Sequence, residues 1–337
     1  MFEHFLMLHK RIIYWLTLFF AILVSFIAKS QQTRFRVIHF DETTGLQTTI
    51  INSILQDKTG YMWFGTGEGL YRYDGYTFQA FKKIVGESNS LQDNAVQKLA
   101  EDHDGKIWIG LLNGISSYDP ATGIFANYSV KDIDSTSPVH DVSMLFIDKE
   151  NNVWAGLMQK GLIKLDKASG TFSHYDVIPA SNTFYSTELR SSYNIVYDMY
   201  EEGNGTYWLA THDGLYRFNE PTKTMQPVRA RPIIKDMVRN DLFLSIANDR
   251  NGLWLGSWAG GLSYYNFRTN AWSNYKFNPQ LTNTGTINIA HNIKFDKNGT
   301  LWVATSDKGI GTFDTATKQF DFYSDDISTR SMMPANH

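Results

Sequence analysis

Six tryptophans recur along the chain at nearly constant spacing, and this repeat limits the possible folds more than any other feature. They are separated by 45, 46, 54, 46 and 48 residues, and they are Trp63, Trp108, Trp154, Trp208, Trp254 and Trp302. A period of about 40 to 50 residues, in which each copy holds several short strands, is typical of a β-propeller. The spacing therefore indicates that one structural unit is repeated along the chain.

Each copy follows the same order of residue types. An apolar stretch ends in an acid or amide, a turn with Gly or Asn follows, and the tryptophan comes next. A second Gly then precedes an aliphatic residue, and a last aromatic stretch closes the unit. Short apolar runs between such turns are strands, four per unit. We predict an all-β propeller of four-stranded blades, with six complete repeats near residues 49–81, 95–128, 140–175, 193–228, 240–275 and 287–323.

The six repeat tryptophans are predicted to be core residues rather than ligand platforms. Large aromatic side chains at one fixed position suit the space between neighbouring blades, where each buries on the order of 150 to 250 Å². The composition agrees with a large core, since 42% of the residues are hydrophobic and 15% are aromatic. A single closed all-β domain of about 300 residues is ordinary.

The two ends of the chain predict how the ring closes. Residues 35–40 resemble a fourth strand without three strands before it, and residues 324–337 suffice for one strand more. Propellers pair N-terminal and C-terminal strands because closure removes exposed sheet edges. We expect six complete repeats plus an orphan N-terminal strand, as in a truncated seven-bladed ring. A closed six-bladed ring is the alternative.

The first 30 residues predict export. A basic group, His9 to Arg11, precedes an apolar run of 17 residues from Ile12 to Ala28. Small residues then follow in the pattern that a signal peptidase recognises. We predict that residues 1–30 are a signal peptide cleaved before Gln31, which leaves a sensor domain over 31–337 in the periplasm. An uncleaved inner-membrane anchor is the alternative, because the run is only slightly short for a membrane span.

Composition and motifs exclude several kinds of chemistry. The absence of cysteine excludes disulfides, thiol catalysis and cysteine-bound zinc. The histidines are scattered without HxH or HExxH spacing, and the chain has no GxSxG or phosphate-binding loop. The net charge of −3 comes without a run of basic residues, which argues against a nucleic-acid partner. We predict no enzyme, no metal and no cofactor.

The residues from Ile54 to Phe78 carry a family resemblance. This stretch, with Trp63-Phe64-Gly65-Thr66 at its centre, closely resembles the two-component regulator propeller repeat, and the likeness extends over about residues 36–323. The resemblance implies the periplasmic sensor half of a hybrid two-component system, many of which detect polysaccharide fragments. It also implies partner domains downstream: further propeller units, a membrane helix and a kinase. Kinase and receiver segments are absent from this sequence, so we expect a fragment of such a sensor.

The residues that break the repeat predict the ligand site. In propellers the loops between second and third strands converge on one face, where their side chains vary on a fixed scaffold. Trp258 lies in such a loop, four residues after Trp254, where packing does not require it. It can stack on a sugar ring while polar loop residues bind hydroxyl groups. The candidate polar residues are Glu68, Asn113, Gln159, His212, Asp213 and Asp307.

Each candidate residue also has a simpler interpretation. Trp258 can instead shield a neighbouring blade, and the polar residues can be solvated turn residues. The long connection from Asp176 to Ser192 can cover the ligand face or be an idle surface loop.

Three classes of function fit the sequence. The favoured one is a non-catalytic sensor propeller that recognises oligosaccharides or a neighbouring domain. A protein-interaction or homodimerisation scaffold is the first alternative. An exported propeller polysaccharide lyase or hydrolase is the second, and His212 with Asp213 is the pair that suggests it.

Overall fold

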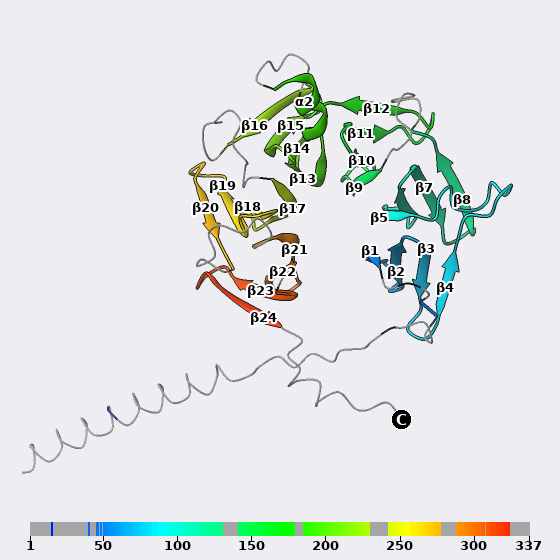
Figure 1. Cartoon of the computed structure of the whole chain (residues 1–337), viewed down its shortest axis with the longest axis horizontal. Coiled ribbons are helices and arrows are strands. Elements are labelled where there is room, and N and C mark those ends of the chain that lie inside the picture. The colour runs from blue at the N-terminus through cyan, green and yellow to red at the C-terminus, as the bar shows by residue number, and fades with distance from the viewer. Residues whose placement is uncertain are drawn as a thin grey trace, which may run out of the picture. The chain divides into compact units, whose positions relative to one another are not determined.

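The computed structural model describes most of the repeat region of the chain (Figure 1). The described residues are 15, 40, 45, 46, 48, 50–130, 141–178, 185–229, 242–277, 288–306 and 308–323. The predicted signal peptide and most of the predicted orphan strand lie outside these residues. Among the described residues, no helix has the length and apolar character needed to span a membrane.

The described strands form six separate four-stranded antiparallel sheets, as the repeat predicts. Blade 1 is formed by β1 Ile51–Gln56, β2 Met62–Thr66, β3 Gly69–Tyr73 and β4 Phe78–Phe81. Blade 2 is formed by β5 Val96–Glu101, β6 Ile107–Leu111, β7 Gly114–Asp119 and β8 Ile124–Tyr128. Blade 3 is formed by β9 Val142–Ile147, β10 Val153–Leu157, β11 Gly161–Leu165 and β12 Phe172–Tyr175.

The second half of the ring repeats the same order after one short helix, α2 Thr187–Tyr193. Blade 4 is formed by β13 Val196–Gly203, β14 Thr206–Thr211, β15 Gly214–Asn219 and β16 Thr224–Val228. Blade 5 is formed by β17 Phe243–Asn248, β18 Gly252–Ser257, β19 Leu262–Asn266 and β20 Trp272–Tyr275. Blade 6 is formed by β21 Ala290–Phe295, β22 Leu301–Thr305, β23 Ile310–Asp314 and β24 Gln319–Tyr323.

Each repeat tryptophan is fixed by a carboxylate of its own blade, which lies in the turn after the first strand or, in blade 4, near the end of that strand. The indole Nε1 donates to that carboxylate over 2.7 to 3.1 Å in all six blades. The pairs are Trp63–Asp57, Trp108–Asp102, Trp154–Asp148, Trp208–Glu202, Trp254–Asp249 and Trp302–Asp296. This contact satisfies the one polar atom of a large apolar side chain and so permits its burial.

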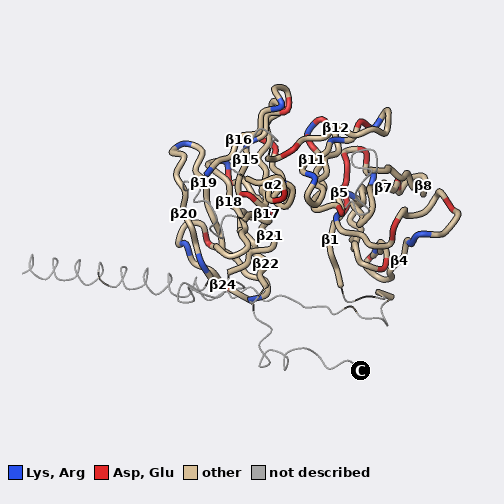
Figure 2. Tube along the Cα trace, turned by 45° about the horizontal axis from the view of Figure 1, so that its top comes forward, with Lys and Arg blue, Asp and Glu red and all other residues tan. Residues whose placement is uncertain are grey.

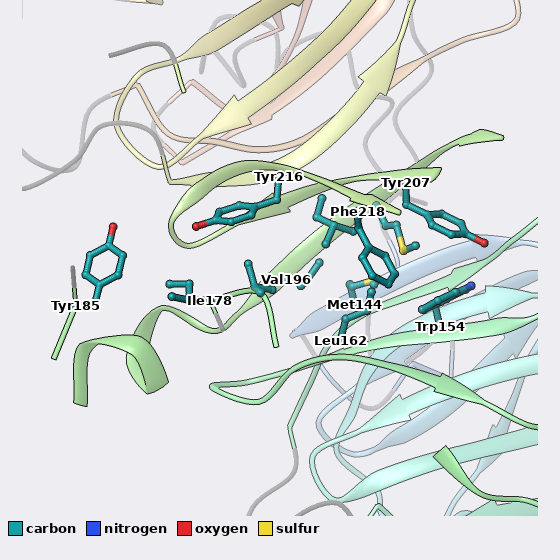
Figure 3. Packing of buried hydrophobic residues seen from close by; sticks show 12 residues of the cluster. Met144, Trp154, Leu162, Ile178, Tyr185, Val196, Tyr207, Tyr216 and Phe218 are labelled. Carbon is teal, nitrogen blue, oxygen red and sulfur yellow. The ribbon is translucent and has the colours of Figure 1, made fainter. Parts of the chain in front are cut away.

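Five of the six tryptophans are buried between blades, as predicted for core residues. Five of them have at most 4% of their surface exposed, whereas Trp302 is half-buried. Figure 3 shows one such interface, in which Trp154 and Leu162 of blade 3 pack against Tyr207 and Phe218 of blade 4. Each interface is therefore a small hydrophobic core shared by two consecutive sheets.

Glycines next to the tryptophans allow the blades to approach closely. A Cβ atom at Gly65 would lie 2.6 Å from Val96 Cγ1, and one at Gly110 would lie 2.5 Å from Val142 Cγ1. Real Cβ atoms do not approach so closely, so the W-x-G spacing reflects the fit of the next blade's first strand.

The inner strands of consecutive blades contact one another from β1 through β5, β9, β13 and β17 to β21. Within the described residues, no hydrogen-bonded ladder joins blade 6 to blade 1, and these two blades share no comparable contact. In Figure 1 the ring of blades opens between the first and the last.

Candidate functional site

In blades 2 to 5 the turn between the second and third strands lies beside the segment that leads into the first strand. Leu112 N donates to Ala95 O, Met158 N to Asp141 O and Trp258 N to Leu242 O, over 2.9 to 3.0 Å. We call the surface formed by these turns and lead-in segments the turn face. It is the face on which the sequence places the candidate ligand residues.

A hydroxyl residue fixes the shape of four of these turns. Thr211 Oγ1 donates to Gly214 O over 2.7 Å and accepts from Asp213 N over 3.1 Å. The corresponding side chains in blades 1, 5 and 6 make the same contact to the turn glycine: Thr66, Ser257 and Thr305. Because these hydrogen bonds fix the backbone of the turn, the side chains at its tip can vary without changing its conformation.

In blade 4 the turn face is covered by the long connection that precedes the blade. Asp213 is buried, and its carboxylate accepts from Tyr185 Oη over 2.6 Å, from Arg229 Nη2 over 2.9 Å and from Tyr216 Oη. Burial raises the pKa of Tyr216, and the negative charge of Asp213 beside it raises that pKa further. Figure 3 shows Tyr185 and Tyr216 with their hydroxyl groups at the same end of the cluster.

Helix α2 completes this cover. Ser186 caps the helix, its hydroxyl accepting from Leu189 N over 3.3 Å. The ring of Tyr193, at the end of the helix, stacks on His212 with centroids 5.0 Å apart. Burial lowers the pKa of His212, and the nearby Asp213 opposes that shift only in part. Of the two interpretations of this connection, the structure favours the one in which it covers the face, over blade 4.

In blades 5 and 6 the turn face is open. Trp258 has 47% of its surface exposed, although its backbone N is held by Leu242 O. The ring of His291 meets the indole edge-on, with centroids 6.4 Å apart. His291 Nε2 lies 2.6 Å from Ser306 Oγ, and both side chains are exposed. An aromatic surface and two hydrogen-bonding groups from neighbouring blades therefore lie side by side.

The other candidate residues do not join this cluster by any contact recorded among the described residues. Glu68 and Gln159 are exposed, each at the tip of its own turn. Asn113 is half-buried and donates from Nδ2 to Asp93 Oδ2 over 3.0 Å. Asp307 lies outside the described residues. As a ligand set, the candidates remain a prediction.

Charged residues of the inner strands add a second polar region. Asp198 Oδ2 accepts from Ile246 N of the next blade over 2.9 Å. Burial raises the pKa of Asp198 to about 6, against the opposing effect of its two backbone hydrogen bonds. Burial also lowers the pKa of Lys98, which Asp198 and Asp141 oppose. Figure 2 shows acidic and basic residues interspersed over the blades. No group of three or more His, Asp or Glu side chains suited to a metal occurs in the described part of the chain.

The contacts that decide which candidate residues are buried and which are exposed were not predicted from the sequence. Ser306 lies in a variable turn and His291 at an ordinary position of the repeat, so the contact of His291 with Trp258 and its hydrogen bond to Ser306 are what mark this pair. In the same way, Arg229 and Tyr185 lie far from Asp213 in sequence. One feature of the sequence did indicate the cover, because the insertion between Asp176 and Ser192 lies directly before blade 4.

Comparison with known proteins agrees with the repeat. The profile of the two component regulator propeller family matches residues 45–68 and 90–113. A 75-residue stretch is 37% identical to Histidine kinase P4 of Formosa agariphila and covers 21% of this chain and 6% of that protein.

Two solved structures show the same fold. The extracellular domain of a hybrid two component system from B. thetaiotaomicron matches with a TM-score of 0.67 and 23% identity, over 86% of this chain and 37% of that one. Virginiamycin B lyase from Staphylococcus aureus matches with a TM-score of 0.59 and 13% identity, over 83% and 86%. The chain thus spans a minor part of the sensor relatives that it matches.

Proposed function

We propose that this chain, whose repeats belong to the two component regulator propeller family, is a non-catalytic ligand-recognition domain of an exported two component sensor. The likeness of one stretch to a histidine kinase supports a role in signalling, with the remaining domains of such a sensor as its partners. The periplasm is the proposed location, in keeping with the predicted signal peptide in residues 1–30.

We propose that the ligand is an oligosaccharide bound on the turn face of blades 5 and 6. The exposed indole of Trp258 is the observation that carries this proposal. The apolar face of a sugar ring can stack on a flat aromatic side chain, and its hydroxyl groups need donors and acceptors at the rim. His291 and Ser306 supply such groups beside the indole, and both can exchange their mutual hydrogen bond for one to a hydroxyl.

The surroundings of His212 and Asp213 favour binding over catalysis. General acid and base groups must reach the substrate with an available proton or lone pair. Asp213 is buried and engaged by Tyr185 and Arg229, and Tyr193 covers one face of the imidazole. The fold shared with virginiamycin B lyase does not change this view, because one fold serves many functions.

Calorimetric titration of the full chain against a panel of plant and host glycan fragments tests the proposal. We expect one class to bind, and we expect Trp258→Ala to raise its Kd by about tenfold or more, since about 1.4 kcal/mol of stacking corresponds to that factor. The melting temperature of the variant should stay within about 1 °C of the parent, because an exposed side chain contributes little to stability.

Tyr76→Ala is the matched control for this titration. Tyr76 is 90% exposed and lies in the turn between β3 and β4. The substitution therefore removes an exposed aromatic ring that lies away from the turn face. Its Kd should equal that of the parent chain. Failure of every glycan to bind, or equal losses in both variants, would refute the sugar site and favour the scaffold or homodimer alternative.

A further inference from the structure

The first strand of every blade has a bulge near its start. One residue is skipped in the pairing with the second strand, as between Val196 and Asp198 of β13 and between Ala290 and Asn292 of β21. A bulge changes the direction of a side chain and is common beside binding sites. The six bulge residues are Asn52, Gln97, Ser143, Tyr197, Leu244 and His291.

Each turn between the second and third strands supplies one residue next to the bulge. His212 N donates to Ile195 O over 3.1 Å, just as Trp258 N donates to Leu242 O over 3.0 Å, so the two residues hold the same place in successive turns. The residues at this place are Gly67, Leu112, Met158, His212, Trp258 and Ser306. Side chains with a ring occur at the bulge and turn positions only in blades 4, 5 and 6.

In blades 4 and 6 the bulge residue and the turn residue form a pair of an imidazole and a hydroxyl group. Tyr197 Oη lies 3.2 Å from His212 Nδ1 in blade 4. His291 Nε2 lies 2.6 Å from Ser306 Oγ in blade 6. Each pair keeps further donor or acceptor capacity, because a hydroxyl oxygen has two lone pairs and an imidazole has two nitrogens.

Trp258 of blade 5 lies between these two pairs. Its ring meets the bulge residue of the next blade, His291, with centroids 6.4 Å apart. The same register places His212 next to Leu244, the bulge residue of Trp258's own blade, and strands β13 and β14 contact β17 there. We call this row of residues the blade 4–6 strip: Tyr197, His212, Leu244, Trp258, His291 and Ser306.

His212 holds the hydroxyl group of Tyr197 in place. Tyr193 of α2 stacks on one face of the imidazole, with centroids 5.0 Å apart, and so fixes its orientation. Burial lowers the pKa of His212, so the neutral ring can accept a proton from Tyr197 at Nδ1. The oxygen of Tyr197, which is half-buried, then keeps its lone pairs for a hydroxyl group of a ligand. His212 is therefore a positioning residue, and its cover by α2 is part of that role.

The composition of the strip indicates the kind of sugar. None of its six residues is Asp, Glu, Lys or Arg. A carboxylate or sulfate group on a sugar is best recognised by Arg or Lys, through charge-assisted hydrogen bonds. Arg229, on blade 4, is engaged by the buried Asp213 over 2.9 Å. The strip thus suits hydroxyl groups and apolar ring faces rather than anionic groups.

We propose that Tyr197 forms a second subsite of the turn face, so that the ligand is a chain of at least three neutral sugar units laid along the blade 4–6 strip. The middle unit stacks on Trp258. One neighbouring unit bonds to Tyr197, and the other bonds to His291 and Ser306. This inference rests on the proposed function, to which it adds the length and charge class of the ligand and a residue that reads the length.

Calorimetric titration of the full chain with oligomers of graded length tests the second subsite. The probes are oligomers of glucose, xylose, mannose and galactose, each of one to six units, with oligogalacturonate as the acidic comparison. We expect one neutral series to bind, with a Kd that falls about tenfold or more from one unit to three and then stays level, because each subsite adds hydrogen bonds. Salt should leave this Kd unchanged, since no charge pair is formed.

Tyr197→Phe removes the hydroxyl group and keeps the ring. It should raise the Kd of oligomers of three or more units about fivefold, the loss expected for one hydrogen bond, and leave the Kd of the single sugar unchanged. Tyr200→Phe is the matched control, because it makes the same change on the same strand, β13, where the side chain packs against the core of blades 4 and 5. It should bind like the parent at every length, whereas Trp258→Ala should weaken binding at every length.

The outcomes separate this inference from the proposed function. A Kd independent of length, or parent affinity of Tyr197→Phe for every oligomer, would overturn the second subsite, and the sugar site would stand if Trp258→Ala still weakens binding. Lys308 follows Ser306 by two residues, so binding of oligogalacturonate alone, weakened by salt, would overturn the neutral class in favour of an acidic sugar. Failure of every sugar to bind would refute the proposed function, and this inference with it.

Discussion

Trp254 and Trp302 occupy the same position in neighbouring blades, and they differ in what lies beyond them. Both donate from Nε1 to a carboxylate of their own blade, over 2.9 and 3.0 Å. Trp254 is 1% exposed, because Phe313 of blade 6 packs against its ring with centroids 5.2 Å apart. Trp302 is half-buried, and it stacks on Tyr323 of its own blade.

This difference separates two contributions that the repeat tryptophan makes to stability. The indole–carboxylate contact is local, so it forms wherever the repeat occurs, with or without a following blade. Burial of the ring is supplied by the next blade, so it is a property of the ring of blades rather than of the unit. Repeat proteins combine in this way an intrinsic term for each unit and a term for each interface.

The largest expected effect follows from that separation. Trp254→Ala should reduce the free energy of unfolding by about 3 to 5 kcal/mol, the range for a large aromatic side chain in a packed core. Trp302→Ala should cost about 1 to 2 kcal/mol, since it loses a hydrogen bond and only part of the buried area. Urea unfolding of both variants checks this, and equal losses would show that the two tryptophans contribute alike to stability.

Most of the fold could be predicted from the sequence because it depends on contacts within one unit. The alternation of strands and turns, and the carboxylate ahead of each tryptophan, recur at fixed spacing. In blade 5 the carboxylate belongs to Asp249, one residue beyond the Asn248 at which the sequence places the end of the stretch. A shift of one residue in a turn leaves the strand pattern unchanged, so periodicity alone does not locate it.

The candidate site was predictable only in part, because it depends on contacts between units. The sequence identified Trp258 as a residue that breaks the repeat, and the structure places it in the open. The sequence assigned His212 and Asp213 the same role, yet α2 and Tyr185 cover them. Helix α2 itself was not predicted, since it has only seven residues and interrupts the repeat of strands.

The second prediction compares close packing two residues after the repeat tryptophan in blades 5 and 6. A Cβ at Gly256 would lie 2.7 Å from the backbone oxygen of Ala290 in the next blade, so Gly256→Val should cost about 2 kcal/mol by overpacking. Ala304, the matching residue of blade 6, lines a cavity of about 550 Å³, so Ala304→Val should change stability by less than about 0.5 kcal/mol. Thermal melting distinguishes the two, and a large loss for Ala304→Val would indicate that blade 6 is packed like the others.

The smallest effect concerns the carboxylates and their response to acid. Burial opposes the charge on Asp102, yet hydrogen bonds from Trp108, Lys167 and the Lys106 backbone hold its pKa below the usual value. For Asp296, hydrogen bonds from Trp302 and the Thr300 backbone also lower the pKa. A carboxyl group with a depressed folded pKa stabilises the protein above its unfolded pKa of about 4, and this contribution is lost as the pH falls through the folded value.

Asp102→Asn should therefore cost about 1 kcal/mol at pH 7 and flatten the fall in melting temperature below about pH 4, because Lys167 loses its charged partner. Asp296→Asn should flatten the acid limb in the same direction and cost less at pH 7, because no lysine of a following blade is paired with it in the described residues. Melting curves from pH 3 to 7, at low and high salt, measure both. If salt weakens the effect of Asp102→Asn and leaves that of Asp296→Asn unchanged, the charge pair of Asp102 and Lys167 contributes to the interface between blades. An equal response to salt in both variants would assign both effects to contacts within a single blade.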